Sequence, residues 1–410
     1  MHVSALVFRC LFSKSTSYPC LLVAGLYVHI PFCAKRCVYC DFYFVTTGYL
    51  YEPFTNALCL EIEHQGKRYG KAEPIRTIYF GGGTPSLMPI DQLARILNAL
   101  AQWFDLSQLE ECTLEVNPDD LSLTRLRAWE SLGINRLSIG IQSFRDEDLQ
   151  LMGRAHRAEQ ALKSIPLVRK AGFDNFSIDL IFGIPGQSMS DWIEMLNQAI
   201  DLDVPHISAY GLTVEEGTVL NRQVKRGLIT PTSEDSMSVL LGFTMMHLQN
   251  SGYRHYEISN YAKPGYEAIH NQLYWAHKNY LGFGPSAHSF WWNHPPSPDV
   301  KRWSNVRNLR HYQKMLLDDY QLPIQDEERL TRLDLVNEYI FLRLRTEDGI
   351  DLEHLEEQYG VDLLLEKLDD IAWLEESHYI HPIRKHRIQL TDGGKILCDS
   401  VTQRFLYDSL

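Results

Sequence analysis

The chain has 410 residues, of which 45% are hydrophobic and 22% are charged, the balance of an ordinary globular protein. A formal net charge of −13 argues against constitutive binding of nucleic acid, although an acidic protein can still hold a local basic pocket for an anionic ligand. No run reaches the ~20 apolar residues that a transmembrane helix requires, so we do not expect a membrane protein. The length favours one large domain with a smaller one beside it.

Residues 1–24 form a segment that contains Arg9 and Lys14 but no acidic residue. The two basic side chains interrupt the apolar core that a secretory signal would need. The serine-rich, acid-free composition also fits a transit peptide. We interpret 1–24 as a disordered leader or the product of a mis-set start codon, and we expect a cytoplasmic protein.

From Leu26 onward, apolar runs rich in β-forming residues alternate with stretches of helical spacing, such as Leu93, Ile96, Leu97 and Leu100. The runs expected to be strands are 26–30, 77–80, 112–116, 137–141, 176–180 and 206–212. Six strand–helix units in series predict a parallel sheet with helices outside it. Because parallel crossovers share one hand, such a sheet closes partly or fully. The expected fold class is α/β, a partial (β/α)6 barrel.

The alternation of predicted strands and helices ends after Leu212, and the sequence becomes rich in aromatic residues and glycine between 261 and 290. Beyond Asp326 it predicts helices followed by a short β-hairpin around 388–390. We therefore assign 25–240 to the barrel, 241–325 to a connecting region, and 326–410 to a C-terminal, mainly helical, winged-helix-like domain. The acidic surroundings favour an interaction or lid role for this domain over DNA binding.

Polar or glycine-rich loops follow four of the predicted strands. They are residues 81–85 (G-G-G-T-P), 117–118 (N-P), 142–144 (Q-S-F) and 183–186 (G-I-P-G). In parallel α/β folds, ligands bind at the carboxyl ends of the strands. The four loops are therefore expected to converge on one site.

Three of the eight cysteines, Cys33, Cys37 and Cys40, lie within eight residues directly after the first predicted strand. The scatter of the others argues against a secreted disulfide framework, so the triplet predicts a metal site. Soft thiolates suit iron–sulfur or zinc centres. Structural zinc normally takes a fourth cysteine or histidine, and His29 and Asp41 are near enough to leave zinc open. On a four-iron cluster, three thiolates leave one iron without a protein ligand.

The spacing Cys-x3-Cys-x2-Cys after a first strand resembles the radical S-adenosylmethionine superfamily. The resemblance implies a [4Fe-4S] cluster on Cys33, Cys37 and Cys40, whose open iron holds S-adenosylmethionine. The loop 81–85 resembles the motif that lines the methionine end of this cofactor, and Tyr39 matches an aromatic position that covers the cluster and adenine. The residues implied to bind the cofactor are Tyr27, Tyr39, Gly82, Gly83, Thr84, Glu115, Gln142, Arg154 and Asp179. The polar ones could alternatively be simple strand-end or cap residues.

From Tyr27 to about Leu410 the chain resembles the oxygen-independent coproporphyrinogen III oxidase-like (HemN-like) family, most specifically in 27–33 (Y-V-H-I-P-F-C) and 140–144 (G-I-Q-S-F). The oxidase itself has a further cysteine two residues after the last cluster ligand, where this chain has Phe42. A heme-chaperone branch lacks that cysteine and carries an H-N-x-x-Y-W motif. Residues 270–275 (H-N-Q-L-Y-W) match this motif fully. The resemblance therefore favours the chaperone branch.

This branch implies a protein that binds heme, with a contact at His270, and passes it to a hemoprotein such as a membrane-bound respiratory component. Neutral imidazole is a common ligand of heme iron, and aromatic rings pack on porphyrins. A buried, hydrogen-bonded histidine in an aromatic cluster is the open alternative for His270. The alternative function is the oxidase reaction, in which S-adenosylmethionine chemistry decarboxylates coproporphyrinogen III to protoporphyrinogen IX. We assign no catalytic residue.

Overall fold

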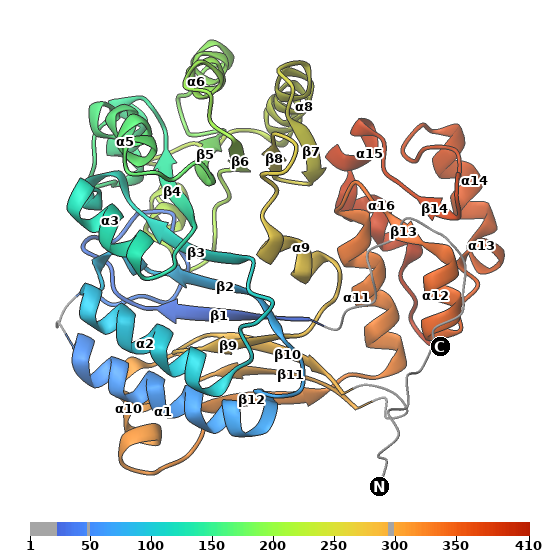
Figure 1. Cartoon of the computed structure of the whole chain (residues 1–410). Coiled ribbons are helices and arrows are strands. Elements are labelled where there is room, and N and C mark those ends of the chain that lie inside the picture. Colours follow the sequence, from blue (N-terminus) through green and yellow to red (C-terminus); the bar gives the residue numbers. More distant parts are fainter. Residues whose placement is uncertain (1–22, 47–49, 294–298) are drawn as a thin grey trace, which may run out of the picture.

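The computed structural model describes residues 23–46, 50–293 and 299–410, shown in Figure 1. The predicted leader, 1–24, lies outside the described residues except for Val23 and Ala24. Ala24 is the first residue of the first strand.

Within the described residues, one sheet of 12 strands runs through the molecule, and its centre consists of parallel strands in chain order. These are β1 (Ala24–Ile30), β2 (Ile75–Gly82), β3 (Glu111–Val116), β4 (Arg136–Gln142), β5 (Phe176–Phe182) and β6 (His206–Gly211). All six strands predicted from the sequence are present. Parallel strands are covered on both faces, which explains their nearly continuous apolar runs. The α/β, partial (β/α)6 barrel is confirmed.

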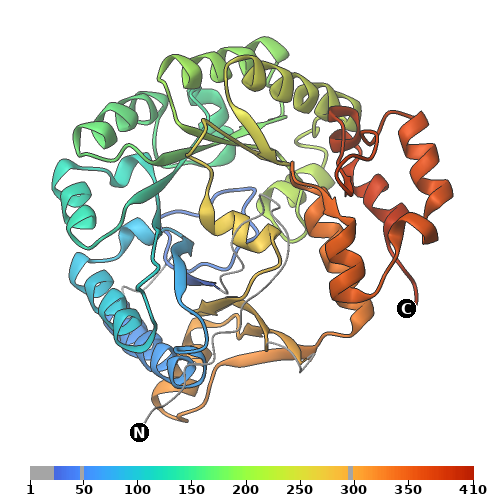
Figure 2. The same ribbon diagram turned by 45° about the vertical axis from the view of Figure 1, so that its right-hand side comes forward.

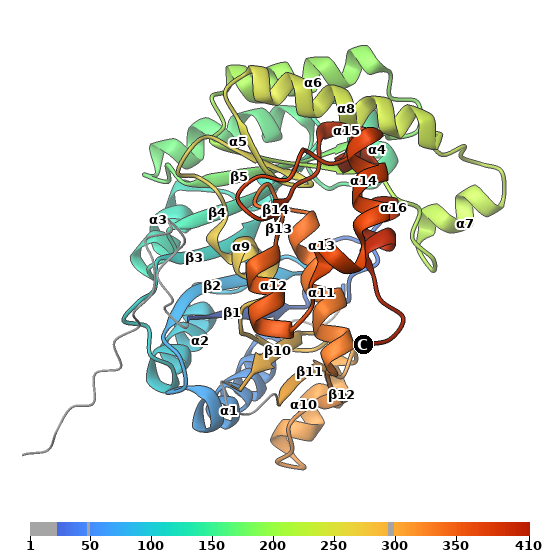
Figure 3. The same ribbon diagram turned by 90° about the vertical axis from the view of Figure 1, so that its right-hand side faces the viewer.

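Helices cover the outside of the barrel (Figures 1 and 2). They are α1 (Tyr51–Tyr69), α2 (Ile90–Trp103), α3 (Leu123–Ser131), α5 (Ala158–Lys170), α6 (Met189–Asp201) and α8 (Glu234–Asn250). Two short helices, α4 (Asp146–Met152) and α7 (Val219–Lys225), lie at the carboxyl ends of the strands (Figure 3), and single 3₁₀ turns, η1 (Pro85–Leu87) and η2 (Pro118–Asp120), follow β2 and β3. Leu93, Ile96 and Leu100, expected on one face of a helix, are fully buried. Apolar residues at helical spacing thus seal the helices onto the sheet.

The sheet continues beyond β1 and β6 with further strands that were not predicted from the sequence. Beside β1 lie β9 (Tyr280–Phe283), β10 (His288–Trp292), β11 (Val300–Asn305) and β12 (Ile324–Arg329), and beside β6 lie β8 (Asn260–Ala262) and β7 (Arg254–Glu257). Only β9 of these runs parallel to its barrel neighbour, β1. α10 (Leu309–Leu317) packs against α1 outside this extension. The connecting region therefore widens the barrel wall.

The C-terminal unit is mainly helical and lies against β10 and β11 (Figure 3). Its elements are α11 (Arg332–Leu344), β13 (Ile350–Asp351), α12 (Leu352–Tyr359), α13 (Leu363–Glu366), α14 (Leu368–Glu376), β14 (Arg387–Ile388), α15 (Asp392–Ile396) and α16 (Cys398–Phe405). Its core includes Phe290 and Val300 from the large sheet. The strand expected near 388 is present as β14, but it pairs with β13, which precedes α12.

The proposed domain boundaries stay predictions. Residue 240 falls inside α8, and residue 326 falls inside β12, which still belongs to the large sheet. The helices of the C-terminal unit begin at Arg332.

α9 (Ile269–Trp275) carries the H-N-x-x-Y-W motif and lies inside the ring of strands, where Figure 2 shows it in yellow. The Glu111 carboxylate, at the start of β3, accepts hydrogen bonds from the backbone amides of Ile269 (2.9 Å) and His270 (3.1 Å). Arg136 Nε lies 3.8 Å from the same carboxylate, and both side chains are buried. Since amides at a helix start lack partners within the helix, a carboxylate there anchors it. Glu111 therefore fixes α9 at the amino ends of the strands.

Glu111→Ala should lower the free energy of unfolding by about 3–5 kcal/mol, because it leaves Arg136 buried without its carboxylate and two helix amides without acceptors. Denaturant titration of the cofactor-free protein measures this change. The control is Glu110→Ala, which removes a partly exposed pair with Arg76 and should cost less than about 1 kcal/mol. Equal losses in the two variants would show that Glu111 is not an anchor.

Candidate functional site

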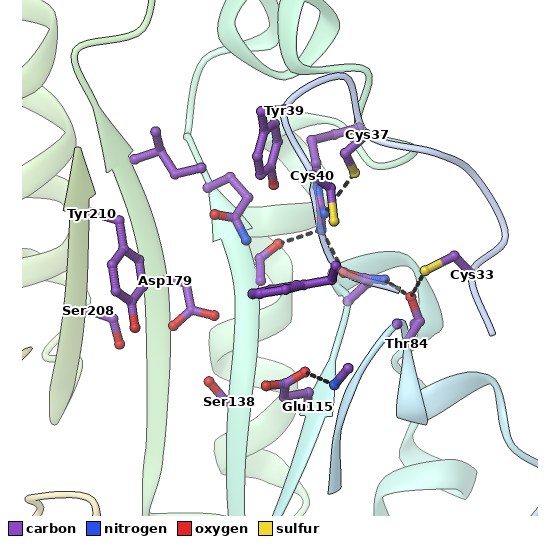
Figure 4. A pocket seen from close by; sticks show the side chains of 18 of the residues that line it. Cys33, Cys37, Tyr39, Cys40, Thr84, Glu115, Ser138, Asp179, Ser208 and Tyr210 are labelled. Carbon is purple, nitrogen blue, oxygen red and sulfur yellow. Dashed lines mark hydrogen bonds between the residues drawn. The ribbon is translucent and has the colours of Figure 1, made fainter. Parts of the chain in front are cut away.

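A cavity of about 620 Å³, called the first cavity below, lies at the carboxyl ends of the parallel strands. Figure 4 shows the cysteines on one side of it and Asp179, Ser208 and Tyr210 on the other. The predicted site residues that line it are Cys33, Cys37, Tyr39, Cys40, Gly82, Gly83, Thr84, Glu115, Gln142, Arg154 and Asp179. The structure therefore brings together residues from the ends of β1 to β5, as expected for a parallel sheet.

One of the four loops expected at this site does not line the cavity. Gly183 packs against the start of α8, where a Cβ on it would collide with the Met237 side chain, and Ile184 is buried beside Leu149 and Met152 of α4. The Gly183 carbonyl accepts a hydrogen bond from Thr232 (2.8 Å), and its amide donates to Gln187 (3.0 Å). The expectation that all four loops converge was wrong for 183–186, where Gly183 serves local packing and Gly186 has a left-handed backbone conformation with φ of +87°.

The cysteine loop is held by backbone hydrogen bonds to distant segments. The Cys33 amide donates to the carbonyl of Val45 (3.0 Å), and the Val38 amide donates to that of Met152 (3.1 Å). These contacts attach the loop to the end of α4 and orient its thiols toward the cavity. Burial raises the pKa of Cys33 and of Cys40 to about 11. Their thiolates therefore need a nearby positive charge, which coordinated metal supplies.

Two polar side chains face the sulfur atoms. Thr84 Oγ1 lies 3.6 Å from Cys33 Sγ, and Arg154 Nη1 lies 3.4 Å from Cys37 Sγ. Donors of this kind favour the ionised form of a thiol. The three cysteines on one loop, with donors to two sulfurs and an open cavity beside them, fit a cluster that keeps one iron free of protein ligands.

His29, one of the two side chains that left zinc open, is not free to bind a metal ion. Both ring nitrogens of His29 are engaged, with Nδ1 3.1 Å from the Tyr27 hydroxyl and Nε2 2.9 Å from the Tyr43 carbonyl. Burial lowers the pKa of His29 to about 4. Across 23–46, 50–293 and 299–410, no three His, Cys, Asp or Glu side chains are grouped for a single metal ion. The arrangement therefore favours the cluster over mononuclear zinc.

The glycines after β2 are needed because the chain passes very close to the segment before the cysteines. A Cβ on Gly83 would lie 2.8 Å from the Phe32 carbonyl oxygen, and one on Gly82, whose φ is +111°, would meet the His29 ring. The Gly83 amide donates to the Ile30 carbonyl (2.8 Å). Only glycine accepts this approach, so the loop fixes the position of the cysteine loop as well as lining the cavity.

Two partly buried acids face the first cavity. Glu115 accepts hydrogen bonds from the Tyr79 hydroxyl (2.9 Å) and the Gly82 amide (3.1 Å), and burial raises its pKa to about 7. Burial raises the pKa of Asp179 to about 6, against the opposing effect of a hydrogen bond with Ser208. Carboxylates in such a cavity can accept hydrogen bonds from amino and hydroxyl groups of a ligand.

Arg154 and Gln142 complete this part of the site. Arg154 Nη2 donates to Asn117 Oδ1 (2.6 Å) and to the Gly140 carbonyl (2.9 Å), while its buried Nε has no hydrogen-bond partner among the described residues. Gln142, at an irregularity in the pairing of β4 with β5, has φ of +66°, the left-handed region that a non-glycine residue rarely adopts. This backbone conformation places Gln142 in the cavity wall, next to Arg154.

Around Asp179, a polar patch deep in the barrel includes residues that were not predicted from the sequence. Ser138 of β4 lies beside Ser177 of β5 in the sheet, with their hydroxyls 3.0 Å apart, and Asp179 lies beside Ser208 of β6. Arg136 and His206 also line the first cavity. Polar residues at matching levels of three otherwise apolar strands were a usable signal, because buried strands rarely carry them without a function.

A second cavity of about 700 Å³ lies between the sheet and α11. Tyr27, predicted to bind the cofactor, lines this cavity and not the first one. The residues that line both cavities are Asp41, Phe42, Gly82 and Glu115. The two cavities therefore adjoin at the ends of β1 and β2.

His270 lines neither cavity and is 1% exposed. Its Nδ1 lies 2.7 Å from Thr77 Oγ1 and its Nε2 lies 2.8 Å from the Tyr274 hydroxyl, while its ring stacks on Tyr79. Burial lowers its pKa to about 3, so the ring is neutral. Iron coordination by His270 would require one of these two hydrogen bonds to break. In this arrangement His270 packs between Tyr79, a wall residue of the first cavity, and Tyr274, one of the second.

Comparisons with known proteins agree with this architecture. Residues 27–199 match the Radical SAM superfamily and residues 330–397 match the HemN C-terminal domain. The chain is 35% identical to "Heme chaperone HemW" of Lactococcus lactis subsp. lactis (strain IL1403), over 94% of this chain and 97% of that one. The chain belongs to the HemW family. HemW of Bacillus subtilis (strain 168) is 34% identical over 93% of this chain and 98% of its own length.

Other relatives place the HemW family among radical SAM proteins more widely. "Radical S-adenosyl methionine domain-containing protein 1, mitochondrial" of Danio rerio is 34% identical, over 81% of this chain and 75% of that one. The structure of coproporphyrinogen III oxidase (HemN) from Escherichia coli superposes with a TM-score of 0.79 at 25% identity, covering 95% of this chain and 91% of that chain. Membership implies a [4Fe-4S] cluster and S-adenosylmethionine. None of the helices in the described part of the chain has the length and apolar character needed to cross a bilayer.

Glu115 should make the stability of the cofactor-free protein depend on pH. Its pKa is raised from 4.5 to about 7, so folding takes up a proton between these values, and the stability that it contributes below pH 4.5 is lost as pH rises. Between about pH 5 and about pH 8, Glu115→Gln should remove up to about 3 kcal/mol of this decline. Denaturant titration across the range measures it. Glu110→Gln, at an exposed site, should keep the parent curve, and an unchanged curve in Glu115→Gln would refute the assignment.

Proposed function

We propose that this protein is a heme chaperone, which binds heme, holds a [4Fe-4S] cluster with S-adenosylmethionine, and delivers heme to hemoproteins. The observation that carries the proposal is the similarity to proteins named heme chaperone HemW over nearly the whole chain. A membrane-bound hemoprotein is the acceptor class that we propose, and the cytoplasm is the proposed compartment. A relative has "mitochondrial" in its name, so the proposed compartment is to be tested by localising this protein in its own cells.

In this proposal, Cys33, Cys37 and Cys40 ligate the cluster from the wall of the first cavity. The cofactor-binding residues proposed beside it are Tyr39, Gly82, Gly83, Thr84, Glu115, Gln142, Arg154 and Asp179, all in contact with this cavity. Glu115 and Asp179 would accept hydrogen bonds from the ligand, and Arg154 would balance the negative charge of thiolate and carboxylate. When bound, the cluster and S-adenosylmethionine would supply one-electron reduction chemistry.

The oxidase function is the weaker candidate. Phe42 occupies the position of the oxidase's additional cysteine, and its side chain is 66% exposed at the junction of the two cavities. An apolar ring at this place can pack on a flat, apolar ligand, but it cannot supply the chemistry of a thiol.

Each of Cys33→Ala, Cys37→Ala and Cys40→Ala should lose most of the cluster, because two thiolates hold it poorly. Iron and sulfide content after anaerobic reconstitution measures this, and the EPR signal of the reduced parent should change when S-adenosylmethionine is added. Cys59→Ala, on α1 outside the first cavity, should keep the cluster. Tightly bound zinc without a cluster in the parent protein would rule out the proposed centre.

The protein should bind heme stoichiometrically and should not convert coproporphyrinogen III. A hemin titration followed at the Soret band measures binding. Anaerobic incubation of the reconstituted protein with coproporphyrinogen III, S-adenosylmethionine and reductant, followed by porphyrin analysis, measures turnover. Escherichia coli HemN serves as the positive control. Sustained formation of protoporphyrinogen IX would restore the oxidase function, and the absence of any heme binding would refute the chaperone.

A further inference from the structure

The second cavity has the dimensions and the walls of a site for a large flat ligand. Its volume of about 700 Å³ lies within the range of about 300–1,000 Å³ typical of small-molecule sites. It lies between the inner face of β1, β9, β10 and β11 on one side and α11 on the other, where Figure 3 shows α11 in front of the strands. Of the residues that the resemblance implies for the radical SAM cofactor, Tyr27, Gly82 and Glu115 reach this cavity, whereas its strands β9 to β11 and α11 carry none of them.

Aromatic rings form much of its walls. The rings of Tyr274 and Tyr280 lie 4.5 Å apart, and those of Tyr280 and Phe290 lie 6.3 Å apart in a stacked arrangement. Phe341 and Leu342 face them from α11. Ring faces of this kind pack well on an extended π-system such as a porphyrin.

An arginine without a carboxylate partner among the described residues lies at the end of the second cavity that adjoins the first cavity. Arg307 is exposed, and its only hydrogen bond in the described parts of the chain runs from Nη2 to the Asp41 carbonyl (2.7 Å), so no carboxylate neutralises it. Arg302 also lines the cavity, but its guanidinium is paired with Glu328 and Glu338. Arg307 can therefore bind a carboxylate of a ligand in the fork geometry that guanidinium offers.

His288 is an available metal ligand at the same end. It begins β10 on the face that also carries Phe290, and its side chain has no hydrogen bond among the residues described. Burial and the charges of Arg302 and Arg307 lower its pKa, so the imidazole is neutral and can coordinate iron. The other histidines of this cavity are less available, since both ring nitrogens of His29 are hydrogen-bonded, and His277 bonds Glu338 through Nε2 (3.2 Å) while its Nδ1 is buried.

We infer that the second cavity is the heme site, with the porphyrin between its aromatic walls, the iron on His288 and a propionate on Arg307. This inference rests on the proposed function and deepens it, because it moves the contact from His270 to residues that a ligand can reach. A propionate lies at the porphyrin edge, so the proximity of His288 and Arg307, at the same end of the cavity, suits one heme. Phe42 would border the same ligand from the junction of the two cavities.

Two ligands separate iron coordination from binding of the macrocycle. Full-length protein is titrated with hemin, followed at the Soret band, and with metal-free protoporphyrin IX, followed by fluorescence. His288→Ala should weaken hemin binding by about tenfold or more and shift the Soret band, while protoporphyrin IX binding stays within about twofold of the parent. Arg307→Gln should weaken both ligands, because both carry the propionates.

Matched controls and a blocking variant complete the test. His311→Ala and Arg310→Gln change exposed residues of α10 outside the cavity and should bind both ligands as the parent does. Leu342→Trp should fill the cavity from α11 and weaken both ligands. Thermal unfolding of every variant confirms that its fold is intact.

Three further outcomes separate this inference from the proposed function. Parent-like binding of both ligands by His288→Ala, Arg307→Gln and Leu342→Trp would overturn the second cavity as the heme site and leave the chaperone function standing. Loss of hemin binding in His270→Ala, with His288→Ala unaffected, would return the iron ligand to α9. A parent protein that binds no heme at all would refute the chaperone function itself.

Discussion

The buried carboxylate of Glu111 is the contact on which the arrangement of both cavities depends. It holds the first turn of α9 at the amino ends of the barrel strands, and its charge is balanced by Arg136. With the helix fixed there, Asn271 faces the first cavity and Tyr274 faces the second. The H-N-x-x-Y-W motif therefore acts in this structure as a partition, and a buried ion pair gives it a single position.

Much of the barrel and of the first cavity could be predicted from the sequence, because parallel strands buried on both faces give apolar runs and their carboxyl ends carry the polar loops. The cysteine triplet could likewise be recognised from the sequence as a metal site. The outer strands β7 to β12 were missed, since they do not follow the strand–helix alternation of the barrel, and their attachment to it depends on two pairings between segments far apart in the chain, β9 with β1 and β8 with β6. The second cavity was missed because no local pattern shows that Tyr27, Tyr280 and Phe290, from three strands, share one wall.

Charge pairing along the sheet edge explains how an acidic protein can offer a site to an anion. Lys301 pairs with Glu327 and Arg302 with Glu328 between β11 and β12, so most of the charge on these strands is neutralised locally. Arg307, just after β11, keeps a guanidinium without a carboxylate partner among the residues described. The net charge of −13 therefore says little about the potential inside this cavity.

The wall that the two cavities share consists of Asp41, Phe42, Gly82 and Glu115. One substitution in this wall therefore changes both cavities at once. Phenotypes of such substitutions in cells cannot be attributed to one chamber, and pairs of them are not expected to be additive. Mutations meant to affect one cavity should therefore be made at residues that line only that cavity, such as Asp179 in the first cavity or His288 in the second. The same geometry places selection on the two chambers jointly, so that drift in one is constrained by the other.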